Sequence, residues 1–108
     1  MTGQGMVIEQ RTYTLSPERM QEYLALYERE GLPIQGKVLR MLGYFLADGD
    51  SPSQVVHLWG YDSMEDRSRK RAELQAAPGW KDYVAKVKPF YARQECRILA
   101  PLPWSPIR

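Results

Sequence analysis

The fold of this chain is decided by one stretch, Val55-Val56-His57-Leu58-Trp59-Gly60-Tyr61. Successive residues of a β-strand point to opposite faces, so the stretch divides into two sets: Val55, His57, Trp59 and Tyr61 on one face, and Val56, Leu58 and Gly60 on the other. A half-buried antiparallel strand alternates apolar and polar residues, because one of its faces meets water. Neither face suits water here, so the pattern predicts a strand that is covered on both sides. Its aromatic residues and the chain's single histidine either line a small-molecule pocket or pack into an interface.

Three more strands are predicted along the chain. Residues 6–15 alternate with the period of two that is typical of a strand, and they contain several β-branched side chains. Residues 41–47 carry apolar or aromatic side chains on both faces. They are followed by a polar segment with glycine and proline, residues 48–53, whose composition is typical of a hairpin loop. The last strand is expected over residues 91–99.

The first helical region begins at Ser16-Pro17-Glu18. Here a capping serine, a proline suited to the first turn and an acidic residue at the positive end of the helix dipole follow one another. An apolar stripe with spacings of three and four residues follows: Met20, Tyr23, Leu24 and Tyr27. We expect Gly31-Leu32-Pro33 to break this helix and residues 34–40 to resume it at a different angle.

The second helical region follows the strand at residues 55–61. Asp62 or Ser63 is placed to cap it, and acidic residues stand in its first turn. Residues 77–79, Ala-Pro-Gly, are expected to interrupt it, because a proline disfavours helical geometry in the residue before it. A second stripe of helical period then runs to about residue 89: Trp80, Tyr83, Val84 and Val87.

The resulting order, β-α-β-β-α-β, predicts an α+β fold of the ferredoxin-like type, with a four-stranded antiparallel sheet covered on one face by helices. The other face would carry large residues of the second and third strands, an exposed apolar patch of roughly several hundred square ångströms. A homodimer with sheet facing sheet would cover that patch. Residues 101–108 form an extended, proline-rich tail, and we expect its Leu102 and Trp104 to dock somewhere.

Length and composition limit the classes of protein that fit. A chain of 108 residues forms one domain, and a net charge of +2 from 15 basic and 13 acidic residues gives no strong electrostatic preference for a partner. The basic run at residues 67–71 is interpreted as a solvated helix face, because no nucleic-acid-binding motif accompanies it. The single cysteine, Cys96, excludes an internal disulfide and is interpreted as a small filler residue of a strand. No stretch approaches the roughly 18 apolar residues of a membrane span, so we expect a cytoplasmic protein that binds neither membranes nor nucleic acid.

A series of short motifs covers nearly the whole chain after residue 6. They are Glu9-Gln10-Arg11-Thr12-Tyr13-Thr14-Leu15, Glu22-Tyr23 through Tyr27-Glu28, Gly31-Leu32-Pro33, Gly43-Tyr44-Phe45, His57-Leu58-Trp59-Gly60-Tyr61-Asp62, Asp66-Arg67 to Arg71, Pro78-Gly79-Trp80 and Arg97-Ile98-Leu99-Ala100-Pro101. In this order they resemble the NIPSNAP family, which belongs to the dimeric α+β barrel superfamily. The resemblance implies one NIPSNAP-like domain over residues 1–108, with residues 1–5 as a flexible N-terminus, that pairs into a dimeric α+β barrel.

The resemblance implies a range of activities rather than one. The wider superfamily includes cofactor-independent monooxygenases that act on polyketide aromatics, lactone isomerases, cyclases and haem-handling enzymes. These proteins typically hold their ligand in a cavity between the sheet and its helices. By this analogy, since a fold alone does not define a function, the chain is expected to be a cofactor-independent monooxygenase, cyclase or isomerase that acts on an aromatic or polyketide-like small molecule.

Such a cavity needs a few polar groups that converge on an apolar space. The catalytic candidates are His57 as general base, Arg11 to stabilise an enolate or phenolate oxygen, and Tyr13 as a hydrogen-bond donor. The candidates for binding a flat substrate are Tyr27, Trp59, Tyr61 and Trp80, and Tyr61 is also an alternative donor to the oxyanion. The first and third strands are neighbours in a ferredoxin-like sheet, but the sequence leaves open which of their faces coincide.

Each candidate also has a purely structural interpretation. His57 suits a packed core or interface, Arg11 suits an ion pair with Glu9 or Glu95, and the aromatic residues suit ordinary packing. We expect no metal and no cofactor, because one histidine and one cysteine are too few for a zinc site and no phosphate-binding loop is present. The alternative to an enzyme is a non-catalytic small-molecule-binding or protein-interaction module. In the simplest form of that alternative, the aromatic residues serve only to make the dimer. It predicts that side chains fill the space between sheet and helices and leave no cavity of ligand size.

Overall fold

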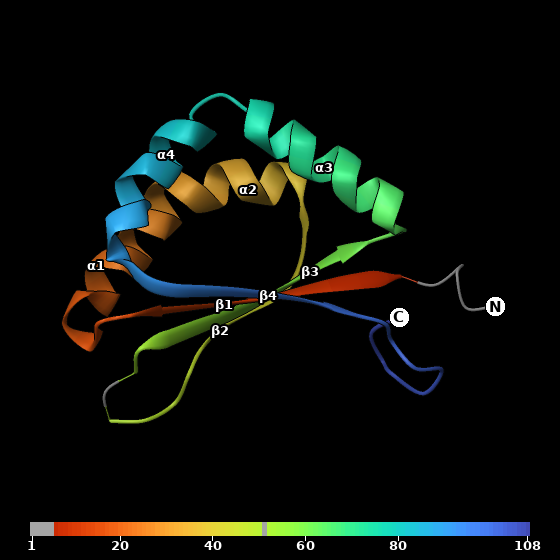
Figure 1. The fold of residues 1–108 in the computed structure, drawn as a ribbon, viewed down its shortest axis with the longest axis horizontal. Helices are drawn as coiled ribbons and strands as arrows, with labels where there is room; N and C mark the ends of the chain where they lie inside the picture. Colours follow the sequence, from red (N-terminus) through yellow and green to blue (C-terminus); the bar gives the residue numbers. More distant parts are fainter. Residues whose placement is uncertain (1–5, 51) are drawn as a thin grey trace.

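The computed structural model describes residues 6–50 and 52–108. Residues 1–5, expected to be a flexible N-terminus, and Ser51 of the expected hairpin loop lie outside the described residues. The described chain forms two layers, an antiparallel sheet and a set of helices that arch over one of its faces (Figure 1). This arrangement confirms the predicted α+β fold.

The sheet contains four strands within the described residues, in the spatial order β2-β3-β1-β4. Their bounds are Val7–Leu15 for β1, Arg40–Leu46 for β2, Gln54–Tyr61 for β3 and Tyr91–Leu99 for β4. All neighbouring strands are antiparallel. Strand β3, which contains residues 55–61, is therefore an inner strand, paired on one side with β2 and on the other with β1.

The first helical region runs on where a break was expected. A short 3₁₀ turn at Pro17–Arg19 leads into α1 (Met20–Leu26), a π-helical turn (Tyr27–Gly31) and α2 (Leu32–Val38) without an intervening loop. Pro33, which has no backbone N–H to donate, lies in the first turn of α2, directly after the π-helical turn. Gly31 serves close packing, since a Cβ on this residue would lie 2.6 Å from Cζ of Tyr83.

The second helical region follows the prediction closely. It consists of α3 (Met64–Ala76) and α4 (Trp80–Val87), followed by a 3₁₀ turn at Lys88–Phe90. Ser63 is the capping residue, because its Oγ accepts a hydrogen bond from the backbone N–H of Asp66 at 2.9 Å. The interruption between α3 and α4 includes Gly79, whose φ of +88° suits glycine.

The strand register settles which faces of β1 and β3 coincide. Arg11 lies opposite His57, and Glu9 lies opposite Trp59. Trp59 is fully buried against the helix layer, so the odd-numbered residues of both strands face the helices. The functional candidates of β1 and β3 thus lie on one side of the sheet.

The opposite face of the sheet and the C-terminal tail expose large apolar side chains. Phe45 is 54% exposed on β2, and Trp104 of the tail is 79% exposed. The tail loops away from the helix layer, so the expected docking of Leu102 and Trp104 does not occur on the chain itself (Figure 1). None of the helices in the described part of the chain is long and apolar enough to cross a membrane.

Candidate functional site

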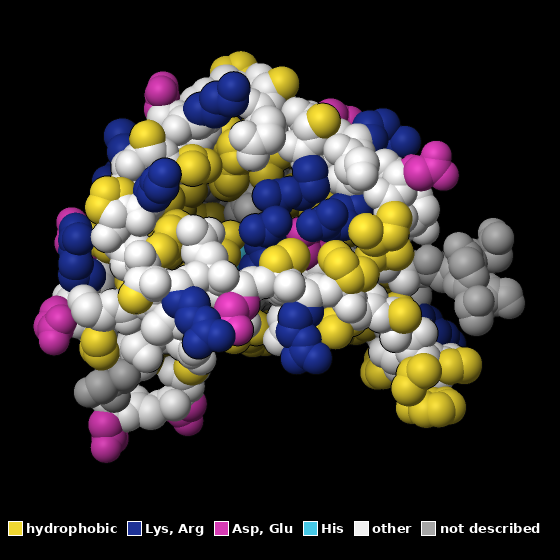
Figure 2. Space-filling view, viewed as in Figure 1, with side chains coloured by type: hydrophobic (Ala, Val, Ile, Leu, Met, Phe, Trp, Pro, Cys, Tyr) yellow, Lys and Arg dark blue, Asp and Glu magenta, His cyan; other side chains and the backbone are white. Residues whose placement is uncertain are grey.

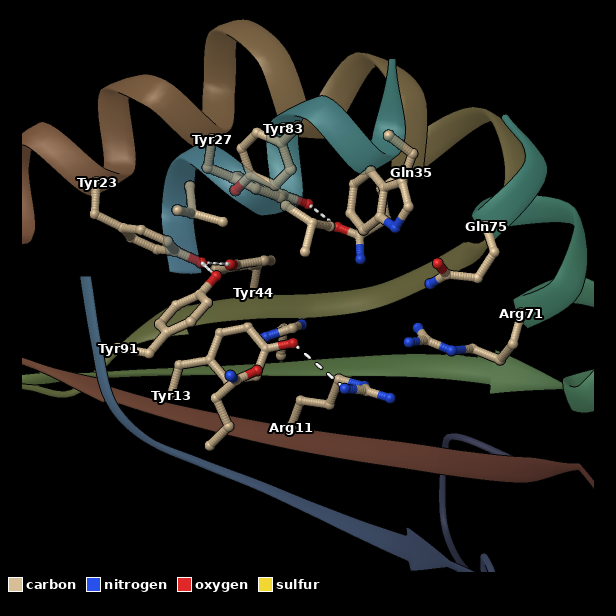
Figure 3. A pocket seen from close by; sticks show the side chains of 15 residues that line it. Arg11, Tyr13, Tyr23, Tyr27, Gln35, Tyr44, Arg71, Gln75, Tyr83 and Tyr91 are labelled. Atoms are coloured by element: carbon tan, nitrogen blue, oxygen red, sulfur yellow. Dashed lines mark hydrogen bonds between the residues drawn. The ribbon is translucent and has the colours of Figure 1, made fainter. Parts of the chain in front are cut away.

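A cavity of about 140 Å³ lies between the sheet and the helices (Figure 3). Strands β1, β2, β3 and β4 and helices α2, α3 and α4 all contribute to its wall, together with α1 and the π-helical turn. The lining residues are Arg11, Tyr13, Tyr23, Tyr27, Gln35, Tyr44, His57, Arg71, Gln75, Trp80, Tyr83, Val84, Val87, Tyr91 and Gln94. The cavity is therefore strongly aromatic, with basic and amide side chains among its lining.

Phenol groups form a hydrogen-bonded set at the aromatic end of the cavity. The hydroxyl of Tyr23 lies 3.3 Å from that of Tyr44 and 3.1 Å from that of Tyr91. Tyr27 donates to Oε1 of Gln35 at 2.7 Å. Burial raises the pKa values of these tyrosines well above that of a free phenol. The hydroxyls stay protonated at neutral pH and act as hydrogen-bonding groups, not as bases.

The imidazole of His57 is buried and has a defined tautomer. Nε1 of Trp59 donates a hydrogen bond to Nδ1 of His57 at 2.7 Å, so the neutral ring carries its proton on Nε2. The ring stacks on Tyr44 with centroids 4.4 Å apart and an interplanar angle of 9°. Burial and the charge of Arg11 lower the pKa of His57 to about 3. At neutral pH this histidine offers an N–H donor, because its lone pair is already engaged.

Glu9 lies beside the cavity, fully buried, and binds several donors. Its carboxylate accepts hydrogen bonds from Tyr61 at 2.9 Å, Arg11 at 3.1 Å, and Nε and Nη2 of Arg67 at 3.0 and 2.6 Å. Burial alone raises the pKa of Glu9, but the hydrogen bonds and charges of the arginines outweigh it and hold the pKa at about 2. Glu9 is therefore ionised and its acceptor capacity is largely used.

Positive charge exceeds negative charge around this carboxylate. A third arginine, Arg71, places Nη1 4.0 Å from Oε1 of Glu9. Three guanidinium groups thus share one carboxylate, a surplus of two positive charges. Figure 2 shows Lys and Arg side chains gathered around a hollow in the middle of the face that it presents. An anion in this region would be stabilised electrostatically.

Four buried polar atoms of the cavity lining have no hydrogen-bond partner among the described residues. They are Nε of Arg11, Nε2 of His57, Nε1 of Trp80 and the hydroxyl of Tyr83. All four can donate a hydrogen bond, and only the hydroxyl can also accept one. A buried donor without a partner is costly, so the cavity is suited to a molecule or waters that supply acceptors.

The structure brings five of the predicted site residues together and leaves two outside the cavity. Arg11, Tyr13, Tyr27, His57 and Trp80 all line it. Tyr13 accepts a hydrogen bond from Nη1 of Arg11 at 3.4 Å. Trp59 and Tyr61 lie buried beside it, and their polar atoms are bound to His57 and Glu9. Trp59 thus holds a side chain that lines the cavity, whereas Tyr61 holds the carboxylate of Glu9 beside it.

Several residues of the site were not singled out from the sequence. The missed residues are Glu9, Tyr23, Gln35, Tyr44, Arg67, Arg71, Gln75, Tyr83, Val84, Val87, Tyr91 and Gln94. Arg67 and Arg71 are four residues apart on α3 and share a helix face, which is a pattern that could have indicated an inward-facing pair. The Glu9–Arg11 ion pair was one of the structural alternatives and is present at 3.1 Å.

Cys96 lies exposed on β4, and its thiol donates to Oε2 of Glu9 at 3.6 Å. In the part of the chain that the structure describes, no group of three or more His, Cys, Asp or Glu residues is arranged to hold a metal ion.

Comparison with known proteins gives one consistent family. The NIPSNAP family model matches residues 8–106. Protein NipSnap of Drosophila melanogaster is 32% identical over 100 residues, which are 93% of this chain and 36% of that protein. The NipSnap homologue of Dictyostelium discoideum is 29% identical, over 94% of this chain and 45% of its own length. The chain thus spans less than half of these curated relatives.

Solved structures agree with this comparison. A NIPSNAP-like domain protein from Burkholderia xenovorans is 44% identical, with a TM-score of 0.86 over 95% of this chain and 90% of its own. A NIPSNAP family protein from Agrobacterium tumefaciens is 37% identical, with a TM-score of 0.90 over 96% of this chain and 92% of its own. A structure assigned as an antibiotic biosynthesis monooxygenase from Nitrosomonas europaea is 14% identical, with a TM-score of 0.69 over 100% of this chain and 98% of its own, which shows a shared fold alone.

Proposed function

Because this chain belongs to the NIPSNAP family and encloses a cavity rich in hydrogen-bond donors, we propose that it is a cofactor-independent enzyme acting on a small aromatic or polyketide-like molecule. The single observation that carries this proposal is the set of four unpartnered buried donors around one aromatic cavity. The fold shared with antibiotic biosynthesis monooxygenases adds an analogy to it.

The step that this site would favour is formation of an oxyanion on the bound molecule. Nε2–H of His57 and the neighbouring donors would hydrogen-bond a carbonyl or phenol oxygen as negative charge develops on it. Arg11 would add a positive charge close to that oxygen. The resulting enolate or phenolate is the common intermediate of isomerisation, cyclisation and cofactor-independent oxygenation.

This mechanism gives His57 a role different from the general base expected from the sequence. With Nδ1 bound to Trp59 and Nε2 already protonated, the ring has no free lone pair with which to take a proton. The proton would leave to water, or the molecule would bind already ionised. His57 therefore acts as a donor, and Trp59 is its positioning residue.

A non-catalytic module remains the second candidate, and the structure does not favour its simplest form. If the aromatic residues served only for packing, the space between sheet and helices would be filled. Instead Arg11 and His57 line an open cavity.

Deuterium exchange tests the proposed step directly. In D₂O, we expect the protein to accelerate exchange at the acidic C–H of benzoylacetone, an open-chain 1,3-diketone with one flat ring that is un-ionised at neutral pH, by at least about tenfold over buffer, as followed by proton NMR. His57→Phe should lose this acceleration, because it keeps the ring but removes the donor. Trp104→Phe should retain it, because this exposed residue of the C-terminal tail does not line the cavity. A diketone that binds without faster exchange would favour the binding module.

The exposed apolar side chains support a homodimer as the active form, formed through the sheet face opposite the helices. Phe45 lies across Gly43 on β2, where a Cβ would come within 2.5 Å of the phenyl ring. An aromatic ring held over glycine on an open sheet face suits a symmetric contact with a second copy.

Sedimentation analysis checks this assembly. The wild-type protein should sediment at twice the 12.5 kDa mass of the chain, and Phe45→Glu should shift it towards the monomer, because it would bury an unpaired charge in the contact. Met64→Glu is the matched control, since Met64 is 47% exposed at the start of α3. A wild-type monomer would contradict the proposal.

A further inference from the structure

The cavity has a basic end and an aromatic end. Arg11, Arg71 and Gln75 lie together on one side of it, and Tyr23, Tyr44 and Tyr91 lie on the other (Figure 3). Among the described residues that line it, two are arginines and none is acidic. A molecule that fills this cavity must therefore suit a basic environment at one end and an aromatic environment at the other.

The three arginines around Glu9 differ in how fully they are bound. Arg67 gives two hydrogen bonds to Glu9, so its guanidinium is committed to that carboxylate. Arg71 reaches Glu9 only at 4.0 Å, with its side chain 24% exposed, and Arg11 keeps an unpartnered buried Nε. Two guanidinium groups with spare donors face the same cavity, which is the arrangement that binds a planar anion.

The volume of the cavity limits the size of the molecule. A closed apolar cavity of about 150 Å³ holds one benzene ring, whereas pockets for drug-sized ligands measure about 300–1,000 Å³. The cavity here, at about 140 Å³, has room for one ring, with a substituent extending to the basic end.

We infer that the substrate of this cavity is a small carboxylate with a single flat ring, its carboxylate held by Arg11 and Arg71 and its ring among the tyrosines. A second oxygen on the ring would offer an acceptor to the unpartnered donors of the lining, among them those of Trp80 and Tyr83. This inference rests on the proposed function for its cavity, but it concerns binding alone and can fail independently of the chemistry.

Calorimetric titration with four probes tests the inference: 4-hydroxybenzoate, benzoate, 4-hydroxybenzamide and acetate. The amide has nearly the shape of the hydroxybenzoate without its charge. We expect 4-hydroxybenzoate to bind at least about tenfold more tightly than the amide, because charge-assisted hydrogen bonds are stronger than neutral ones. We expect benzoate to bind more weakly than 4-hydroxybenzoate, and acetate to bind least, because it has no ring to place among the tyrosines.

The matched variants are Arg71→Met and Arg69→Met. Arg71→Met keeps much of the side-chain bulk but removes the charge, and it should reduce the preference of the acid over the amide, with Arg11 left to hold the carboxylate. Arg69 lies on the same helix but pairs with Asp66 away from the cavity, so Arg69→Met should leave the preference intact.

Three results would overturn the inference. Equal binding of acid and amide would show that the carboxylate is not recognised, and binding of acetate as tight as that of 4-hydroxybenzoate would show that the ring is not. Failure of every probe to bind would also reject it. The proposed function is judged separately, because the diketone used for deuterium exchange carries no carboxylate.

Discussion

Replacing Glu9 with alanine is expected to lower the free energy of unfolding by about 3–5 kcal/mol, the range for removing one partner of a buried ion pair. The change leaves Arg11 and Arg67 without their carboxylate and the hydroxyl of Tyr61 without its acceptor. The larger cost comes from the unpaired charge of Arg11, because its side chain is 17% exposed whereas that of Arg67 is 23% exposed. Urea denaturation at pH 7, with protein concentration held constant, measures the loss.

The control for this prediction is Glu30→Ala. Glu30 also forms an ion pair, with Lys86 at 2.7 Å, but that pair lies at the surface and is screened by solvent. We expect it to change stability little. If Glu9→Ala lowered the free energy of unfolding as little as Glu30→Ala, the arginines would have to be free to turn into water. The buried network would then not stabilise the fold.

The stability of the protein is expected to fall by about 2 kcal/mol between pH 7 and pH 5 because of His57 alone. The pKa of His57 is about 3 in the folded chain, against 6.5 for an unperturbed histidine. The unfolded chain therefore binds a proton more readily than the folded one between these two values. The contribution of His57 to the free energy of unfolding is fully present above pH 6.5. It decreases by roughly 1.4 kcal/mol per pH unit as the pH falls towards 3.

This chain is well suited to the measurement, because it has only one histidine. Unfolding free energies at intervals from pH 7.5 to 5 should show the slope in the wild type and a much flatter line in His57→Gln. Glu9 adds a slope of the same sign, but only below about pH 4.5, where the unfolded carboxyl takes up a proton before the folded one. A wild-type slope equal to that of His57→Gln would mean that His57 is open to solvent.

The two predictions concern one connected polar network beneath the aromatic cavity. Glu9 holds Arg11, and Arg11 helps to keep His57 neutral. Trp59 then sets which nitrogen of His57 carries the proton. Buried networks of this kind keep donors in place before a ligand arrives, and such preorganisation is what oxyanion stabilisation requires.

Local patterns were sufficient to predict most of the elements. The period of two in residues 6–15 and the two apolar faces of residues 55–61 predicted strands that the structure confirms, and Ser63 caps its helix as expected. The expected break at Gly31-Leu32-Pro33 was wrong, because glycine and proline there serve packing against Tyr83 and the start of a helix. From the sequence alone, a glycine and a proline in these roles look the same as a glycine and a proline that form a turn.

The candidate site was predicted only in part. Residues on one strand face, such as Arg11 and Tyr13, could be grouped from their spacing. Arg67 and Arg71 were assigned to a solvated helix face, because the partner that turns them inwards, Glu9, is nearly 60 residues away in the chain. An ion pair between residues far apart in the chain produces no recognisable pattern in the sequence around either of them.

The sequence by itself determined the order of elements, the family and the α+β architecture, because periodicity, capping residues and short motifs act over a few residues. Only the tertiary structure decided the chemistry of the site. The register that places Arg11 opposite His57, the hydrogen bond that puts the proton of His57 on Nε2, and the surplus of arginines over Glu9 all depend on groups from different elements. Such contacts exist only once the chain has packed, so they define what the cavity can bind.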